Sequence, residues 1–169
     1  NGCTNYNDGI MGACKGGHVE LVELMLSLGA KNYNTGLVNA CIGGHLNIIN
    51  RMIELGANDF NNGLYYACNI HIAQLMIDLG ANAFNWSFEN ACSTGNMEII
   101  NLMISHGVDN YNNGLMHACL KGHYEVVKLL FDLGLDEYDE EFLSACEGGN
   151  FEIVELFLSK GVTVTDESL

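Results

Sequence analysis

The stretch NYNTGLVNACIGGHLNIINRMIELGA, residues 32–57, decides the fold, because the rest of the chain repeats it. The dipeptide Ala-Cys recurs with its cysteine at Cys14, Cys41, Cys68, Cys92, Cys119 and Cys146, in steps of 27, 27, 24, 27 and 27 residues. A closing glycine recurs at Gly29, Gly56, Gly80, Gly107, Gly134 and Gly161, in steps of 27, 24, 27, 27 and 27 residues. Since two independent markers agree on one period, we expect an array of six repeats.

Each repeat predicts two short helices. In the first, Leu37, Ala40 and Cys41 have the spacing of one buried helical face, and the pair Gly43-Gly44 then breaks the helix. The second helix is apolar apart from a narrow polar stripe, which predicts packing on both flanks. An Asn or Asp near the start of each first helix is expected to cap its free N–H groups: Asn7, Asn34, Asn61, Asn85, Asn112 and Asp139.

The predicted fold is therefore all-α, a helix-turn-helix solenoid of about six repeats. We expect residues 1–169 to form a single array. Residues 1–7 read NGCTNYN and match the later LGAKNYN, so they are expected to be the tail of a preceding repeat in a longer chain.

The segments GGHLNIINRMIELGA (43–57) and KGHYEVVKLLFDLGL (121–135) resemble the second half of the ankyrin repeat, G-H-L-E-I-V-x-L-L-L-x-x-G-A. The first half departs from the family, because N-x-G-L replaces its T-P-L-H turn and the unit has 27 residues where about 33 are usual. The missing residues fall where the family carries its β-hairpin fingers. The chain thus resembles finger-less, Asn-rich ankyrin arrays of large DNA viruses of amoebae and of protists. The resemblance implies an intracellular, cytoplasmic scaffold, in an infected host cell for a viral array, that binds a protein partner and has no catalytic residue.

The composition of the chain limits the classes of partner that it is expected to bind. Six Lys and Arg oppose 21 Asp and Glu, for a formal net charge of −15. Such a charge repels phosphate backbones and anionic lipids, which argues against nucleic acid and membrane surfaces and favours a basic protein partner. No apolar run reaches the length of about 18 residues that a membrane span needs.

The cysteines and histidines allow a second hypothesis, a metal-binding or redox array. Three repeats contain C-x-x-x-H, at Cys14/His18, Cys41/His45 and Cys119/His123, a spacing that could place two ligands on one helical face. The histidine position becomes Asn96 and Asn150 in two other repeats, an exchange that keeps a turn hydrogen bond but loses a metal ligand. We therefore expect the six repeated cysteines to be small buried core residues, with no cofactor and no metal.

A repeated aromatic residue precedes each expected cap, at Tyr6, Tyr33, Phe60, Phe84, Tyr111 and Tyr138. Ring-on-ring contact between neighbouring connectors would explain this aromatic ladder. We interpret it as structural, because a binding site seldom repeats identically in every unit.

Function is expected where the repeats differ, on the outward face of the first helices. Tyr65 and Tyr66 lie near the middle of the array, Trp86 is the only Trp, and the 24-residue repeat lies in the same place. Large aromatic residues of this kind dominate protein interfaces. The predicted partner-binding residues are Tyr65, Tyr66, Trp86, Asn39, Asn90, Met116 and His117.

No catalytic motif supports an enzyme, since the chain has no phosphate-binding glycine loop, G-x-S-x-G or H-E-x-x-H. The first hypothesis is a non-catalytic protein-binding module. The metal or redox array and an architectural segment of a longer protein stay open as alternatives.

Overall fold

The fold is described from a computed structural model of the chain. It covers residues 5–135 and 139–162, and every regular element in these ranges is a helix. The chain divides into two compact units, Asn1–Ala83 and Phe84–Leu169, and each is described by itself. The predicted all-α helix-turn-helix fold without β-hairpin fingers is confirmed for the described residues.

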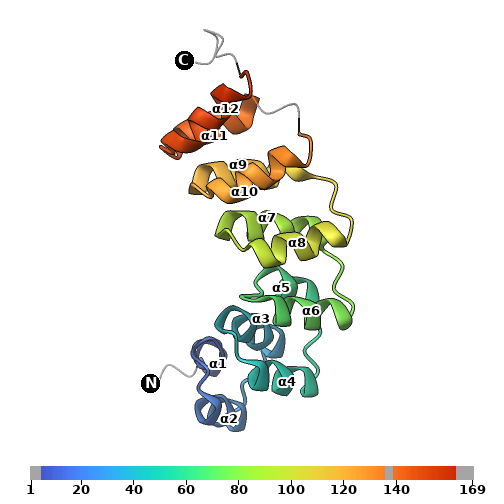
Figure 1. The fold of residues 1–169 in the computed structure, drawn as a ribbon. Helices are drawn as coiled ribbons and strands as arrows, with labels where there is room; N and C mark the ends of the chain where they lie inside the picture. Colours follow the sequence, from blue (N-terminus) through green and yellow to red (C-terminus); the bar gives the residue numbers. More distant parts are fainter. Residues whose placement is uncertain (1–4, 136–138, 163–169) are drawn as a thin grey trace. The chain divides into compact units, whose positions relative to one another are not determined.

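The first unit is built from helix pairs (Figure 1). In each pair the first helix turns back into the second, and α1 and α3 are longer than their second helices. The first helices α1, α3 and α5 pack side by side. The elements are α1 (Tyr6–Gly16), α2 (Val19–Ser27), α3 (Tyr33–Gly43), α4 (Leu46–Glu54), α5 (Phe60–Tyr65) and α6 (Ile70–Asp78).

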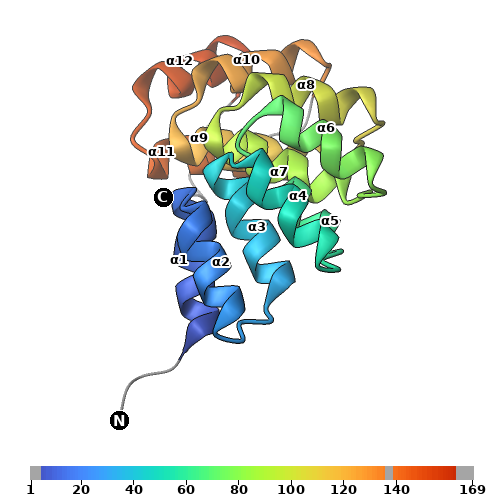
Figure 2. The same ribbon diagram turned by 90° about the horizontal axis from the view of Figure 1, so that it is seen from below.

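The second unit repeats this plan. Figure 2 shows its first helices α7, α9 and α11 in one layer and its second helices α8, α10 and α12 in another. The elements are α7 (Phe84–Thr94), α8 (Met97–Ser105), α9 (Tyr111–Lys121), α10 (Tyr124–Asp132), α11 (Asp139–Glu147) and α12 (Phe151–Ser159).

A glycine with positive φ follows every described helix except α5, as the sequence predicts. After α1, Gly17 has a φ of 76°, and the N–H groups of Gly17 and His18 donate to the carbonyls of Cys14 and Ala13. This is a Schellman arrangement, which satisfies carbonyls that a helix end would leave unpaired. The closing Gly29 plays the same part after α2, with a φ of 100°. The turns are therefore defined by glycine, although the chain contains no Pro.

The predicted faces are confirmed in the second repeat. Leu37, Ala40 and Cys41 are fully buried, whereas Val38 and Asn39 are half-buried. The polar stripe of the second helices is exposed throughout: Glu20, Glu23, Ser27, Asn47, Asn50, Glu54, His71, Gln74, Asp78, Glu98, Asn101, Ser105, Glu125, Lys128, Asp132, Glu152, Glu155 and Ser159. Each second helix thus has one solvent-exposed polar side, and its apolar sides contribute to the core.

The 24-residue repeat joins its helices abruptly, as expected. α5 has six residues where α3 has eleven. Asn69 then caps α6, because its side chain accepts the Ile72 N–H at 3.0 Å. The backbone N–H of Cys68 donates to the Cys41 carbonyl of the preceding repeat at 3.3 Å.

The prediction that the repeated asparagines cap the first helices was wrong. Each first helix begins one residue before its asparagine. The first turn therefore contains Asn7, Asn34, Asn61 and Asn85. Their side-chain oxygens instead accept backbone N–H groups of the next connector: those of Lys31 and Asn32 on Asn7, of Asn58 and Asp59 on Asn34, of Asn82 and Ala83 on Asn61, and of Asp109 on Asn85. We call these four residues the connector asparagines.

The cap position itself lies two residues earlier. Of the residues there, Asp59 accepts the Asn62 N–H at 3.4 Å, while Asn5, Asn32 and Asn110 make no side-chain cap. Asn112 is likewise the second residue of its helix, but the connector that it would hold lies outside the described residues. The Asp139 side chain also lies outside what the structure describes.

The predicted ring-on-ring aromatic ladder was also wrong in the first unit. The aromatic residue is the first residue of its helix, and among the described rings none joins Tyr6 to Tyr33 or Tyr33 to Phe60. In the second unit Phe84 stacks on His106, with ring centroids 4.7 Å apart, and Tyr111 meets Phe88 edge-on at 5.7 Å. The rings therefore pack onto neighbouring side chains, and hydrogen bonds join the connectors. Tyr138 lies outside the described residues.

Replacing Asn34 by Ala should lower the free energy of unfolding by about 1 kcal/mol, because two connector N–H groups lose their acceptor. Asn34→Asp should recover part of this loss, since it keeps the acceptor oxygen. Asn50→Ala is the matched control, because Asn50 is exposed on α4. Urea denaturation of the three variants measures the effect, and equal stability of Asn34→Ala and Asn50→Ala would contradict the role of Asn34.

Candidate functional site

The seven predicted binding residues fall in both units. In the first unit, Asn39 lies on α3, and Tyr65 and Tyr66 lie at the end of α5. In the second unit, Trp86 and Asn90 lie on α7, and Met116 and His117 lie on α9.

In the first unit, the tyrosine pair is at the end of the shortened helix. The rings of Tyr65 and Tyr66 meet edge-on, with centroids 4.5 Å apart. Tyr66 is 43% exposed and Tyr65 is half-buried. Asn39 is half-buried, and its side-chain N–H donates to the Thr35 carbonyl at 2.8 Å. Tyr66 is thus the most accessible of the three.

In the second unit, Trp86 lies in the first turn of α7 and is 51% exposed. Asn90, Met116 and His117 are half-buried. α7 and α9 pack together, and Asn113 on α9 donates to the Glu89 carboxylate at 2.9 Å. The first-helix face therefore presents one well-exposed aromatic side chain in each unit, among residues that are half-buried.

Four of the repeated cysteines are buried core residues, as predicted: Cys14, Cys41, Cys92 and Cys119. The prediction was wrong for Cys68 and Cys146, which are exposed free thiols. Cys68 is exposed because α5 stops at Tyr65, so this cysteine lies in the turn instead of on a helix. Gly36, Gly63 and Gly114 of the following first helices lie against Cys14, Cys41 and Cys92, and no described glycine lies so against Cys146.

Burial raises the pKa of the four buried thiols. Desolvation raises the pKa of Cys14 to about 11. It raises the pKa of Cys41, Cys92 and Cys119 to about 12, with smaller contributions from Cys68, Glu89 and Glu141 respectively. Because the thiolate is the nucleophile and the metal ligand, these four thiols are inert at neutral pH.

Two of the three histidines of the C-x-x-x-H pattern join neighbouring repeats. Nε2 of His45 lies 3.1 Å from the Lys15 carbonyl, and Nε2 of His123 lies 2.9 Å from the Ser93 carbonyl. A carbonyl only accepts, so each ring donates. Asn150 does the same through its side-chain N–H, which donates to the Cys119 carbonyl at 2.6 Å. No group of three His, Cys, Asp or Glu side chains in residues 5–135 and 139–162 could hold a metal ion.

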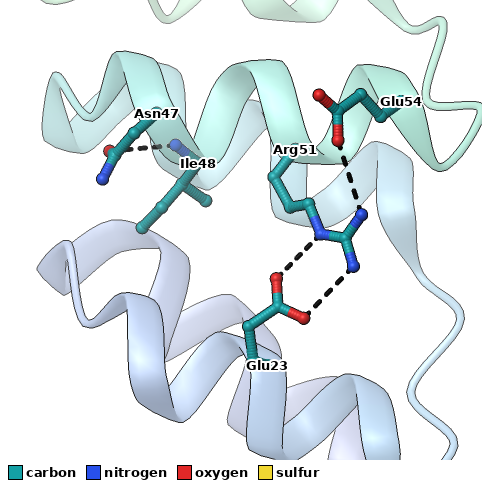
Figure 3. A network of polar contacts seen from close by, with 5 residues as sticks. All are labelled: Glu23, Asn47, Ile48, Arg51 and Glu54. Atoms are coloured by element: carbon teal, nitrogen blue, oxygen red, sulfur yellow. Dashed lines mark hydrogen bonds and ion pairs between the residues drawn. The ribbon is translucent and has the colours of Figure 1, made fainter.

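Sequence reasoning missed a clamp between helix pairs in the first unit (Figure 3). The Arg51 guanidinium donates twice to the Glu23 carboxylate, at 2.7 and 3.2 Å, and once to Glu54 at 3.4 Å. The hydrogen bond from Arg51 holds the pKa of Glu23 below its usual range. The one available signal was that the only arginine of the chain occupies a position that is Leu24 in the first repeat.

A buried carboxylate was also missed. Glu141 is 6% exposed, at the position that holds glycine in four repeats, as at Gly114. Ser87 replaces that glycine in the fourth repeat and is buried too. A charged residue in a small-residue position was the sequence signal.

Open clefts lie along the second helices. One of about 490 Å³ is lined by Tyr124 of α10 and by Glu152, Glu155, Leu156 and Ser159 of α12. Its lining joins an aromatic ring to two carboxylates, which suits a basic side chain better than an acidic one. None of the helices in the described part of the chain is long and apolar enough to cross a membrane.

Residues 88–142 match the family model for ankyrin repeats (3 copies). This segment runs from α7 into α11, and its pairs α7/α8 and α9/α10 have the glycine turn of α1/α2 and α3/α4. In the residues that the structure describes, the chain is accordingly an all-helical repeat solenoid of ankyrin-like fold. No curated protein matches the sequence. Ankyrin repeats are in general protein–protein interaction modules, and the family is typically non-catalytic.

Native thiol reactivity should separate the cysteines into two classes. In a Cys3→Ser background, Cys68 and Cys146 should be alkylated at pH 8 at least about tenfold faster than the four buried thiols, which react only after local opening. Peptide mass spectrometry after timed alkylation measures each rate, and alkylation in denaturant gives the control. Equal native rates for all six thiols would contradict the buried assignment.

Proposed function

We propose that this chain is a non-catalytic module that binds a partner protein through the face of its first helices. The exposure of Tyr66 and Trp86 carries the proposal. Each lies in a different unit, and each is an aromatic side chain left accessible where the other candidate residues are half-buried. Tyr and Trp contribute most to protein interfaces because they bury a large area at a small cost in conformational entropy.

Each unit contributes its own contact point. In the first unit, Tyr66 lies beside Tyr65. Asn39, on the neighbouring helix α3, is a supporting position. Trp86 has Asn90, Met116 and His117 on α7 and α9 as supporting positions in the second.

The charge of the chain supports a basic partner. A formal net charge of −15 accelerates the approach of cationic proteins and disfavours nucleic acid and anionic membrane surfaces. The acidic cleft at Tyr124, Glu152 and Glu155 is a further place where a basic side chain fits. The free thiols support a reducing compartment, such as the cytoplasm.

The metal or redox array finds less support than the binding module. Its histidines His45 and His123 are engaged with backbone carbonyls, and its cysteines Cys41 and Cys119 are buried thiols. An architectural role in a longer protein would leave Tyr66 and Trp86 without effect on any partner.

Tyr66→Ala and Trp86→Ala should each weaken binding by about tenfold or more, because each removes a candidate hot spot. The partner is captured with the wild-type chain and identified, and affinities are then measured by calorimetry with purified proteins. The matched controls are Leu79→Ala in the first unit and Leu133→Ala in the second, since both leucines are exposed and follow second helices, α6 and α10. Wild-type affinity in both aromatic variants would contradict the proposed face.

A further inference from the structure

The abrupt turn of the 24-residue repeat brings two cysteines of the first unit close together. Cys41 is buried on α3, and Cys68 is exposed in the turn between α5 and α6. The backbone N–H of Cys68 donates to the Cys41 carbonyl at 3.3 Å. Residues joined in this way have α-carbons about 6 Å apart, which is inside the range of about 4.4–6.8 Å that disulfides span.

The shortening of the repeat creates this pair. The other repeated cysteines lie within first helices, where backbone N–H groups bond along their own helix: Cys14, Cys41, Cys92, Cys119 and Cys146. Cys68 lies outside a helix because α5 ends at Tyr65, so its N–H reaches the preceding repeat. Neighbouring first helices alone, at about 8–10 Å between axes, would hold two such cysteines too far apart for a bond.

The side chain of Cys68 points back onto the end of α3. A Cβ added at Gly44, three residues after Cys41, would be 3.1 Å from Sγ of Cys68. The side-chain N–H of Asn69 donates to the same sulfur at 3.4 Å, while the Asn69 oxygen caps α6 by accepting the Ile72 N–H. The exposed thiol is therefore held against the helix that carries the buried one.

The Cys41 thiol lies between α3 and α5. A Cβ added at Gly63 of α5 would be 3.5 Å from its Sγ. Burial raises the pKa of Cys41 to about 12, and the nearby Cys68 adds to this increase. The two thiols are thus close enough to interact, although only one of them is accessible to a reagent in solution.

We propose that Cys41 and Cys68 are a redox-sensitive pair, which forms a reversible disulfide within the chain when a peroxide oxidises Cys68. The Cys68 thiolate attacks the peroxide, an S–O bond forms as the O–O bond breaks, and the hydroxide that leaves is protonated to water. A rotation of the Cys68 side chain turns the resulting sulfenic acid toward Cys41.

Cys41 then resolves the sulfenic acid. Its sulfur attacks Sγ of Cys68, the S–S bond forms as the S–O bond breaks, and the leaving hydroxide takes the Cys41 proton and becomes water. In total, two thiols and one hydrogen peroxide give one disulfide and two waters. A thiol such as glutathione reverses the reaction by thiol–disulfide exchange, as is typical of transient disulfides in a reducing compartment.

The test is oxidation of the folded 169-residue chain in a Cys3→Ser, Cys146→Ser background with a slight excess of hydrogen peroxide at neutral pH. Remaining thiols are alkylated before the chain is denatured, so that disulfides cannot exchange. Trypsin and a protease that cleaves before aspartate then isolate Cys41 in residues 32–51 and Cys68 in residues 59–77. Mass spectrometry should find these two peptides joined, with the loss of two hydrogen atoms, and dithiothreitol should separate them.

A sulfenic acid trap, dimedone, tests the role of Cys41. In Cys41→Ser the sulfenic acid at Cys68 has no resolving thiol, so dimedone should label Cys68 about tenfold more than in the background chain. Cys92→Ser is the matched control, since Cys92 is a buried cysteine of the second unit, and it should leave both the disulfide and the labelling unchanged. Cys41→Ala replaces Cys41→Ser if circular dichroism shows a loss of helix.

The joined peptides are measured without any change at Cys41, so the proposal does not depend on the folding of that variant. Absence of the joined peptides after Cys68 is oxidised would overturn the proposal. A Cys68 that pairs with Cys92, or with Cys68 of a second copy, as often as with Cys41 would also overturn it. Equal dimedone labelling with and without Cys41 would do the same.

Discussion

Hydrogen bonds from backbone N–H groups to the side-chain oxygens of the connector asparagines hold four of the connectors to the repeat before them. Asn34 shows the pattern, because its side-chain oxygen accepts the N–H groups of Asn58 at 2.7 Å and of Asp59 at 3.2 Å. In a finger-less repeat the connector has no strand partner to satisfy its backbone. One side-chain oxygen in the first turn of a helix does that work and fixes where the next first helix begins.

Close packing of the first helices follows from this register. Gly36 lies so near Cys14 and Met52 that an added Cβ would be 3.4 Å from the sulfur of Cys14 and 2.6 Å from that of Met52. The small residue lets neighbouring first helices approach, and the cysteine fills the remaining space as a compact apolar group. Burial then raises the pKa of the four buried thiols, so the packing that stabilises the core also keeps these cysteines unreactive. What remains for function is the outer side of the first helices.

The fold was predictable because its causes are periodic. The step of 27 residues, the closing glycines and the apolar spacing of Leu37, Ala40 and Cys41 each give the same register, and the structure confirms it. The role of Asn34 was not predictable from spacing, since a residue near a helix start can cap its own helix or reach the next connector. A shift of two residues in the helix start decides between them. The exposure of Cys68 depended on where α5 ends, which a shortened repeat does not reveal.

The candidate site was predictable only as a set of residue types on one face. Sequence differences between repeats identified Tyr66 and Trp86, but the partial burial of Asn39, Asn90 and Met116 depends on packing between helices. The Arg51–Glu23 clamp joins residues of different repeats at unequal positions, so periodicity alone did not pair them. Such contacts depend on side-chain reach in three dimensions.

The most direct measurement is amide hydrogen exchange by NMR in the wild-type chain and in Asn34→Ala. If the asparagine oxygen holds the connector, the amides of Asn58 and Asp59 should exchange about tenfold faster or more in the variant. Those of Lys31 and Asn32, which Asn7 holds, should keep their wild-type rates. Unchanged exchange at Asn58 and Asp59 would contradict the account, because the connector would then be held by something other than this side chain.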